Sequence, residues 1–328
     1  MKKIITLLLA AMMLLSLAAC GTNDGGDGSA ETAADASYYV GVVQLVQHPA
    51  LDKATEGFQD ALEKELGAGT VSFDVQNASG DSATCATIVN GFVSDGVDLI
   101  MANATPALLA AVNATTTIPV LGTSVTDYGD AMGIEDFDGV VGGNVSGTSD
   151  QPPLDEQAAM VTELCPDAKT VAILYCSAEP NSVFQANAVR GYLEDAGVTV
   201  IEKTFADSND VVAVTTSACE EADAIYIPTD NTAASCADAI GKVVLENKVP
   251  VIAGEESLMA GCGIATLSID YYNLGVATGK MAAKILTGEA DIATMAVEYD
   301  PSPVKKYNPE ICEQLGIEAP EGYTAYEG

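Results

Sequence analysis

The chain has 328 residues, of which 48% are hydrophobic, so it is long enough to bury the cores of two domains of ordinary size. Its 47 acidic side chains outnumber its 13 basic ones, which gives a formal net charge of −34 at pH 7. Nucleic-acid binding and docking of the protein's own surface on anionic lipid both need clustered Lys or Arg, so this charge argues against both functions.

The first element in the chain has the composition of a secretion signal. Met1-Lys2-Lys3 precedes an apolar run, 4–17, that is too short for a stable transmembrane helix. Leu17-Ala18-Ala19-Cys20 closes the run and resembles a lipobox, which implies that residues 1–19 are a signal peptide and that Cys20 becomes the lipidated first residue. Residues 20–37 are small and polar, and they predict a flexible tether. An ordinary secreted protein that is cleaved elsewhere is the alternative.

Short apolar runs then alternate with helical patterns. Residues 39–45 form an apolar, β-branched run, and residues 52–66 place their apolar side chains on one helical face. The alternation continues with predicted strands at 71–76, 98–102 and 119–122 and predicted helices at 82–94 and 106–113. Short buried strands separated by helices predict a parallel, doubly wound sheet.

A polar, Gly-rich segment, 142–153, interrupts the alternation and predicts a connecting strap. A second series follows, with predicted helices at 154–164, 182–196, 209–221, 232–246 and 271–286, predicted strands at 170–175, 198–204, 224–227 and 250–253, and an apolar run at 263–267. The sequence therefore predicts an α/β protein with two similar parallel-sheet halves that bury a ligand between them.

Polar residues gather where the predicted strands end. In open α/β sheets the ligand binds at the carboxyl ends of the strands, where loops and helix N-termini meet. The candidate ligand-binding residues are the polar ones at these ends: Gln44, His48, Asn103, Thr105, Thr123, Ser124, Ser177, Asn181, Asp230 and Glu255. We therefore expect a polar cleft that is rich in hydroxyl and carboxylate groups.

Motifs of catalysis and metal binding are missing from the sequence. His48 is the single histidine, and there is no G-x-S-x-G elbow, Walker A motif or H-E-x-x-H motif. The seven cysteines after Cys20 form neither a C-x-x-C nor a Cys/His zinc pattern, and an odd number cannot pair completely, so we predict free, buried thiols. The sequence therefore assigns no catalytic residue, metal or cofactor.

Several segments carry a resemblance to a known family. They are Val40-Gly41-Val42-Val43-Gln44 leading to His48-Pro49-Ala50-Leu51-Asp52, Ala104-Thr105-Pro106, Gly143 to Asp150, Tyr226 to Asn231, and Asp270 to Gly275. These segments resemble the solute-binding lipoproteins of ABC importers, in particular the subfamily associated with tryptophan and tyrosine uptake. The resemblance extends from about residue 39 to residue 317.

The resemblance implies a type I periplasmic-binding-protein fold with three crossovers. Lobe 1 would comprise 38–147 and 271–296, lobe 2 would comprise 148–270 and 297–328, and a hinge would lie near Gly147 and Ile269. The implied protein is a monomer on the extracytoplasmic face of the cell membrane that is held there by its lipid alone. It would deliver a small ligand, an aromatic amino acid, to a permease and its ATPase. A ligand-sensing surface lipoprotein and a lipid-anchored α/β enzyme are the alternatives.

An α-amino acid needs an anion site beside a cation site. Thr105 and the helix N-terminus that follows it, with Thr123 or Ser124 from the next strand end, are the candidates for the carboxylate. Asp230 and Glu255 are the candidates for the ammonium group. Each role has a structural alternative, because Thr105 and Asp230 also suit plain helix caps and Glu255 also suits an exposed position.

Overall fold

The computed structural model describes residues 37–299 and 303–327, and these belong to one compact unit. The predicted signal peptide, the predicted lipidation site Cys20 and almost all of the predicted tether lie outside the described residues. Among the residues that are described, no helix has the length and apolar content needed to cross a membrane.

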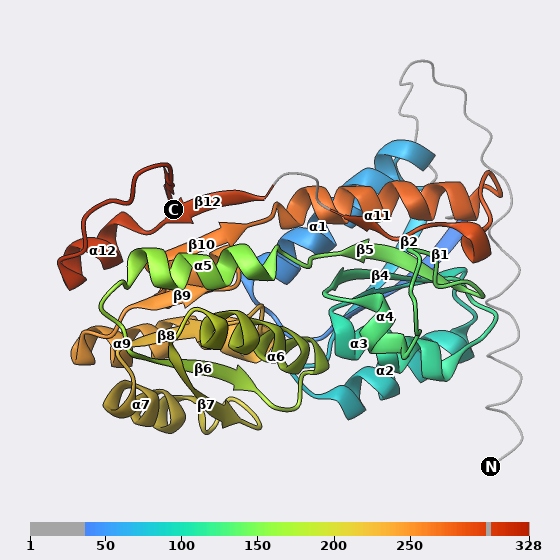
Figure 1. Ribbon diagram of the computed structural model, residues 1–328. Helices are drawn as coiled ribbons and strands as arrows, with labels where there is room; N and C mark the ends of the chain where they lie inside the picture. The colour runs from blue at the N-terminus through green and yellow to red at the C-terminus, as the bar shows by residue number, and fades with distance from the viewer. Residues whose placement is uncertain (1–36, 300–302, 328) are drawn as a thin grey trace, which may run out of the picture. The chain divides into compact units, whose positions relative to one another are not determined.

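The first lobe, on the right in Figure 1, is built on a parallel sheet with strand order β11-β5-β4-β3-β1-β2. Helices cover both faces of this sheet. Phe58 and Met281 pack on one face, and Phe92 and Leu108 pack on the other. The elements are β1 (Tyr38–Gln44), α1 (Pro49–Leu66), β2 (Val71–Asn77), α2 (Ser82–Asp95), β3 (Leu99–Asn103), α3 (Thr105–Ala114), β4 (Val120–Val125), α4 (Tyr128–Met132), β5 (Val145–Ser149), α11 (Tyr271–Leu286) and β11 (Glu298–Tyr299).

The second lobe has a sheet with strand order β13-β12-β10-β9-β8-β6-β7, parallel except where β12 runs against β10. Val189 and Ile311 pack on one face of the sheet, and Ile240 and Leu258 pack on the other. The elements are α5 (Leu154–Leu164), β6 (Thr170–Cys176), α6 (Pro180–Asp195), β7 (Thr199–Phe205), α7 (Val211–Glu221), β8 (Ala224–Ile227), α8 (Asn231–Ser235), α9 (Ala237–Asn247), β9 (Val251–Ala253), α10 (Glu256–Cys262), β10 (Ala265–Ser268), β12 (Val304–Tyr307), α12 (Pro309–Leu315) and β13 (Thr324–Ala325). The predicted class of two doubly wound α/β halves is confirmed.

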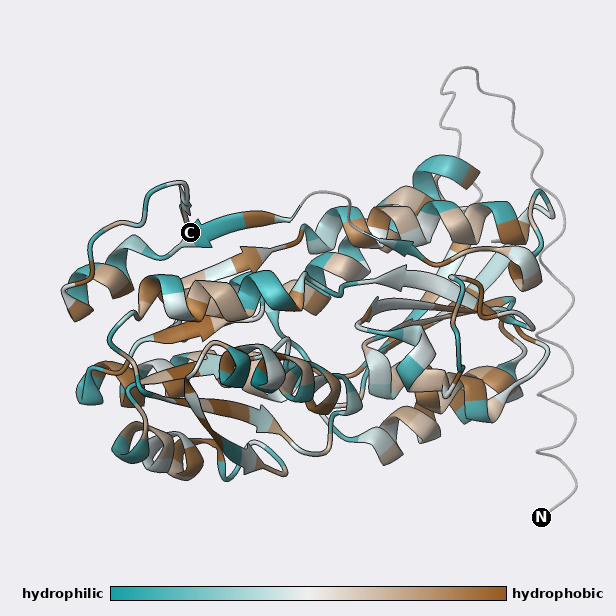
Figure 2. Ribbon diagram, in the orientation of Figure 1, coloured by the Kyte–Doolittle hydropathy of each residue, from teal (hydrophilic) through white to brown (hydrophobic). Residues whose placement is uncertain are grey.

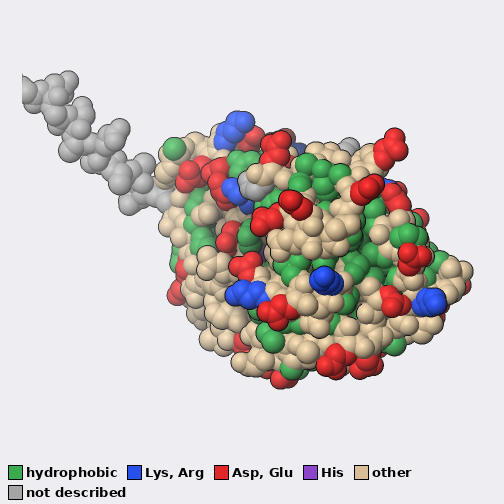
Figure 3. Space-filling view, turned by 90° about the vertical axis from the view of Figure 1, so that its left-hand side faces the viewer, with side chains coloured by type: hydrophobic (Ala, Val, Ile, Leu, Met, Phe, Trp, Pro, Cys, Tyr) green, Lys and Arg blue, Asp and Glu red, His purple; other side chains and the backbone are tan. Residues whose placement is uncertain are grey.

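The positions of hydrophobic and charged residues in the structure agree with the strongly acidic composition of the chain. Figure 2 shows hydrophobic residues concentrated in central strands such as β6, while β12 near the sheet edge is mostly hydrophilic. Figure 3 shows acidic side chains spread over the face of the second lobe, with Lys and Arg side chains between them. This distribution keeps the strong negative charge of the chain in contact with water.

The chain passes between the lobes three times: between β5 and α5, between β10 and α11, and between β11 and β12. The lobe boundaries expected after residues 147 and 296 fall inside β5 and at the start of β11. Both strands continue in the first sheet, because Ser149 pairs with Val125 and Tyr299 pairs with Ser149.

The two expected hinge residues lie in different surroundings. Gly147 is inside β5, with a φ of 149°, and a Cβ on it would overlap the carbonyl oxygen of Gly122. Only glycine fits this close approach of two strands. Ile269 lies in the second crossover and packs with Ala50 and Leu274.

Helices α1 and α11 lie side by side over the first sheet (Figure 1). Their backbones meet at glycines: a Cβ on Gly275 would overlap the carbonyl oxygen of Ala54, and one on Gly57 would overlap that of Tyr272. Because α11 begins directly after the second crossover, this close packing anchors the crossover to the first lobe.

Candidate functional site

The carboxyl ends of the parallel strands meet at the junction of the two lobes. Side-chain hydrogen bonds between described residues join the lobes there. His48 Nε2 lies 3.1 Å from Asn231 Oδ1, and Gln185 Nε2 lies 3.0 Å from Thr126 Oγ1. All four residues are buried. The strand ends of both lobes are therefore in direct contact and are shielded from water.

Unpartnered polar atoms gather at these strand ends. Among the described residues, six buried side-chain nitrogen or oxygen atoms have no hydrogen-bond partner. Five of them lie at these strand ends, and the sixth is Thr266 Oγ1. An unpaired polar atom in a protein interior costs about 1–3 kcal/mol, so a ligand that pairs with it gains that energy. The other five belong to residues that the sequence selects: His48 Nδ1, Asn103 Oδ1, Thr105 Oγ1, Ser124 Oγ and Asn181 Oδ1.

The first lobe presents strained backbone at the same place. Ala104, directly after β3, has a φ of 92°, and Ser124, near the end of β4, has a φ of 54°. Non-glycine residues in such conformations cost of order 1–3 kcal/mol, and they are enriched at binding sites. The strain turns the chain sharply at the ends of two neighbouring strands.

The N-terminus of α3 lies at one of these turns. Its N-cap is Ala104, and no side chain caps it. The interpretation of Thr105 as a plain cap is therefore wrong: Thr105 is the first helical residue, and its hydroxyl is unpartnered. Free N–H groups and a free hydroxyl at a helix N-terminus suit a carboxylate.

The second lobe contributes two buried carboxylates, Asp230 and Glu179. Asp230 accepts hydrogen bonds from the backbone N–H groups of Ala233 at 2.7 Å and Cys176 at 2.6 Å, so its interpretation as a helix cap is confirmed. Burial, and next the charge of Glu179, raise the pKa of Asp230. None of the ion pairs among the described residues involves either carboxylate. Together they make this region favourable for a cation.

Glu179 orients its neighbours. Asn231 Nδ2 donates to Glu179 Oε2 at 2.7 Å, so Asn231 Oδ1 faces His48. His48 Nε2 then carries the proton, as assigned by the hydrogen-bond network. Asn181 Nδ2 donates to the carbonyl oxygen of Thr229 at 2.9 Å and to Glu179 at 3.3 Å. This orientation leaves Asn181 Oδ1 as an acceptor without a partner.

Two predicted residues of the first lobe use their side chains inside that lobe. Gln44 donates to Asp52 Oδ1 at 2.7 Å and accepts from Thr55 Oγ1 at 2.7 Å, so it ties β1 to α1. The Thr123 hydroxyl lies 3.1 Å from that of Thr148. Neither side chain has an atom among the unpartnered ones.

Two predicted residues of the second lobe also stay apart from the unpartnered atoms. Ser177 is exposed, and its hydroxyl donates to the carbonyl oxygen of Phe205. Glu255 is 2% exposed, so the interpretation of it as an exposed side chain is wrong. Its carboxylate caps α10 by accepting from the backbone N–H groups of Ser257 and Leu258, each at 2.6 Å.

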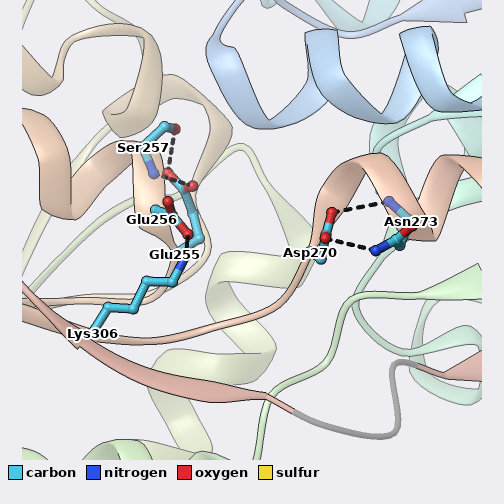
Figure 4. Close-up of polar contacts among 6 residues, drawn as sticks. All are labelled: Glu255, Glu256, Ser257, Asp270, Asn273 and Lys306. Atoms are coloured by element: carbon cyan, nitrogen blue, oxygen red, sulfur yellow. Dashed lines mark hydrogen bonds and ion pairs between the residues drawn. The ribbon is translucent and has the colours of Figure 1, made fainter. Parts of the chain in front are cut away.

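A separate cavity of about 760 Å³ lies beside the second crossover. It is lined by Pro49, Ala50, Lys53, Glu255, Glu256, Ser257, Ile269, Asp270, Tyr271, Tyr272, Asn273, Val304, Lys306 and Tyr326. We call it the hinge-side cavity. Figure 4 shows the ion pair between Lys306 and Glu256 and the hydrogen bonds that Asp270 accepts from Asn273. The Lys306 nitrogen lies 2.5 Å from the Glu256 carboxylate. Glu255 is the one candidate ligand-binding residue in its lining, and none of the five unpartnered atoms at the strand ends belongs to it.

Glu179 and Asn231 lie at polar strand ends that the sequence indicates, but they are not among the candidate ligand-binding residues, and Gln185 was not predicted as a member of the site. Glu179 follows a pattern that also occurs at His48 and Thr105, in which a polar residue at a strand end directly precedes a proline. That repeated pattern could have identified it. Gln185 lies in the interior of α6, where no motif distinguishes it from other helical residues.

The described part of the chain contains no group of three or more His, Cys, Asp or Glu side chains placed to hold a metal ion. All seven of its cysteines are free thiols, four of them buried and three half-buried. The side chains at the strand ends carry hydroxyl, amide, imidazole and carboxylate groups.

Comparisons with known proteins agree with this architecture. A family model described as ABC transporter substrate binding protein matches residues 39–327. A tyrosine-binding protein of Clostridioides difficile (strain R20291) is 38% identical over 295 residues, which are 88% of this chain and 85% of the relative. A solved ABC domain from Streptococcus pneumonia in complex with L-Trp is 33% identical, with a TM-score of 0.83 over 88% of this chain and 99% of that chain.

A second solved structure is described as ligand-free and open. The ligand-free, open structure of a substrate binding protein from Clostridium difficile is 38% identical, with the same coverage of 88% and 99%, but its TM-score is 0.65. The chain therefore superposes better on the L-Trp complex than on this open structure.

Proposed function

Because the chain belongs to the ABC transporter substrate-binding protein family, we propose that it captures an aromatic amino acid between its two lobes and delivers it to a permease and its ATPase. The five unpartnered polar atoms at the strand ends carry this proposal, since they come from both lobes and need a ligand with both donors and acceptors. The tyrosine-binding relative and the L-Trp complex support the choice of ligand class. The proposal gives the chain a transport role and no catalytic step.

The carboxylate of the ligand would bind to the first lobe. Thr105 Oγ1 and Ser124 Oγ are buried hydroxyls that can donate, and the uncapped N-terminus of α3 adds N–H groups beside Thr105. A carboxylate held by such donors makes charge-assisted hydrogen bonds, which are about twice as strong as neutral ones. The dipole of α3 favours the same negative charge.

The ammonium group would bind to the second lobe. Asn181 Oδ1 is an acceptor without a protein partner, and the amide nitrogen of the same side chain donates to Glu179, whose charge acts in turn on Asp230. A cation bound there would be attracted by the Glu179 carboxylate, and it would favour the ionised form of Asp230, whose pKa is raised by burial and by Glu179. The contact predicted for Asp230 is then electrostatic in the main, because both of its oxygens accept backbone hydrogen bonds.

Calorimetric titration with tyrosine, tryptophan and phenylalanine tests the proposal. We expect one ligand per chain, and for the preferred ligand we expect an analogue without the carboxylate or without the amine to bind about 10- to 150-fold more weakly, which corresponds to roughly 1.5–3 kcal/mol. Tyramine and 3-(4-hydroxyphenyl)propionate are the matched analogues of tyrosine. Tight binding of a sugar or nucleoside, without heat from any of the three amino acids, would refute the ligand class.

We also propose a monomer that its lipidated Cys20 holds at the extracytoplasmic face of the membrane. The lipobox-like Leu17-Ala18-Ala19-Cys20 and the small polar tether sequence support this. Cys20→Ser is expected to move the protein from the membrane fraction to the soluble or secreted fraction, as followed by immunoblotting. Cys219→Ser, a change at a half-buried thiol of the folded region, is the control and should stay at the membrane. Continued membrane association of Cys20→Ser would contradict the anchor.

A further inference from the structure

A continuous chain of hydrogen bonds crosses from the second lobe to the hinge. The backbone N–H of Thr229 donates to Gln185 Oε1 at 3.1 Å, and Gln185 Nε2 donates to Thr126 Oγ1 at 3.0 Å. Thr126 Oγ1 donates in turn to Asp150 Oδ1 at 3.2 Å, and the Tyr271 hydroxyl donates to Asp150 Oδ2 at 2.9 Å. Each of these four side chains is buried.

The residues in this series of hydrogen bonds lie on both lobes and on two of the three crossovers between them. Gln185 lies on α6 of the second lobe, and Thr126 directly follows β4 of the first. Asp150 lies in the first crossover, and Tyr271 is the first residue of α11 after the second crossover. Burial raises the pKa of Asp150 to about 6, so at neutral pH it is mostly an ionised acceptor for both hydroxyls.

Within this series of hydrogen bonds, the bond from Gln185 to Thr126 is the one that joins side chains of the two lobes. Because Thr229 fixes the orientation of the Gln185 amide, its Nε2 must face the Thr126 hydroxyl. The bond exists only while the lobes are together. None of its atoms is among the unpartnered ones that we assign to the ligand.

We propose that Gln185 is a positioning residue that sets the population of the closed conformation through its bond to Thr126, and so sets the affinity for every ligand without touching any of them. This inference rests on the proposed function, in which the ligand binds between closed lobes. A ligand that prefers the closed form binds with an apparent affinity reduced by the fraction of protein that is closed. Loss of the bond therefore weakens all ligands by one common factor.

Gln185→Met keeps the length of the side chain and removes its hydrogen bonds. Gln157→Met is the matched control, because Gln157 is equally buried and makes its bonds inside the second lobe, to the carbonyl oxygen of Gly254 at 3.0 Å and from the Tyr226 hydroxyl at 2.6 Å. Both variants should lower the Tm. Only Gln185→Met should weaken tyrosine and tryptophan, by the same factor of about 3 to 15, as calorimetry would measure.

Thr126→Val provides a second approach to the same bond, although it also removes the hydrogen bond from Thr126 to Asp150. Its affinity loss should be at least that of Gln185→Met, and the double variant should lose little more than Thr126→Val alone, because both changes break the same bond between the lobes. Equal affinity losses in Gln185→Met and Gln157→Met, or unchanged affinity in both Gln185→Met and Thr126→Val, would overturn the inference. Absence of amino-acid binding by the wild-type chain would instead refute the proposed function.

Discussion

The double variant Thr105→Val/Ser124→Ala is expected to bind its amino acid roughly 3–6 kcal/mol more weakly than the wild-type chain, a loss of more than about 100-fold. Both hydroxyls are buried without a protein partner, at the start of α3 and near the end of β4. Each change removes one donor from the proposed carboxylate site. The single variants should each lose about half of this energy if the two sites act independently. Calorimetry with tyrosine and tryptophan measures the loss.

We expect the double variant Thr105→Val/Ser124→Ala to lose affinity for the ligand without losing folding stability. Since neither hydroxyl has a hydrogen bond to lose, the Tm of the ligand-free protein should be unchanged or higher. Thr123→Val is the control on the same strand, because its hydroxyl bonds to Thr148 within the first lobe. It should lower the Tm and leave the affinity unchanged. The opposite pattern, with Thr123→Val losing the ligand and the double variant retaining it, would place the site elsewhere.

Gly275→Val is expected to destabilise the protein by about 3–5 kcal/mol or more. A Cβ at this position would overlap the backbone carbonyl of Ala54, and a backbone atom cannot turn aside as a side chain can. Helices α1 and α11 would have to separate, which would open the cluster in which Leu274 packs with Ala50 and Ile269. Equilibrium unfolding in urea measures the change in the free energy of unfolding.

Gly191→Ala is the control for this substitution. Gly191 is an exposed residue in the interior of α6, and no atom lies within 4 Å of a Cβ placed on it. Alanine there should stabilise the protein by about 0.5–1 kcal/mol, because glycine loses more backbone entropy on folding. A Gly275→Val variant as stable as the wild-type chain would show that α1 and α11 are not in close backbone contact.

The architecture could be predicted because apolar periodicity reflects burial. Continuous apolar runs marked the central strands, and one-sided apolar patterns marked the helices that cover them. The same logic failed for β5, whose residues Val145–Ser149 are mostly small and polar and were interpreted as part of a strap. They are nevertheless buried, because Thr148 shares hydrogen bonds with the hydroxyls of Thr123 and Thr278. Hydrogen bonds between hydroxyl groups on neighbouring strands allow polar residues to be buried, and a hydropathy pattern does not reveal such bonds.

The positions of helix ends also depended on local features that the apolar pattern does not show. The helix expected at 232–246 is two helices, α8 and α9, which are separated at Cys236. Helices α1 and α6 begin at Pro49 and Pro180, earlier than the apolar pattern indicated. Proline at the first helical position is the better signal, because its fixed φ suits the helix and its missing N–H is not needed there.

The strand-end rule located the candidate site but did not separate its members. Thr123 and Ser124 are neighbours in sequence, yet the Thr123 hydroxyl pairs with Thr148 and the Ser124 hydroxyl is unpartnered. The strained φ of Ser124 alters the normal alternation of side chains along β4, and sequence does not report it. Gln185 and Asp150 were beyond prediction for another reason: their partners lie on other segments, 59 and 121 residues away in the chain.

A crystal structure of the chain grown with the amino acid that binds most tightly would show the ligand site itself. We predict the ligand between the lobes, with its carboxylate within hydrogen-bond distance of Thr105 Oγ1 and Ser124 Oγ and its ammonium group within that distance of Asn181 Oδ1. We also predict that the Gln185 to Thr126 bond is present in the complex. A ligand bound instead in the hinge-side cavity between Lys53 and Lys306, with the five unpartnered atoms left uncontacted, would contradict this prediction.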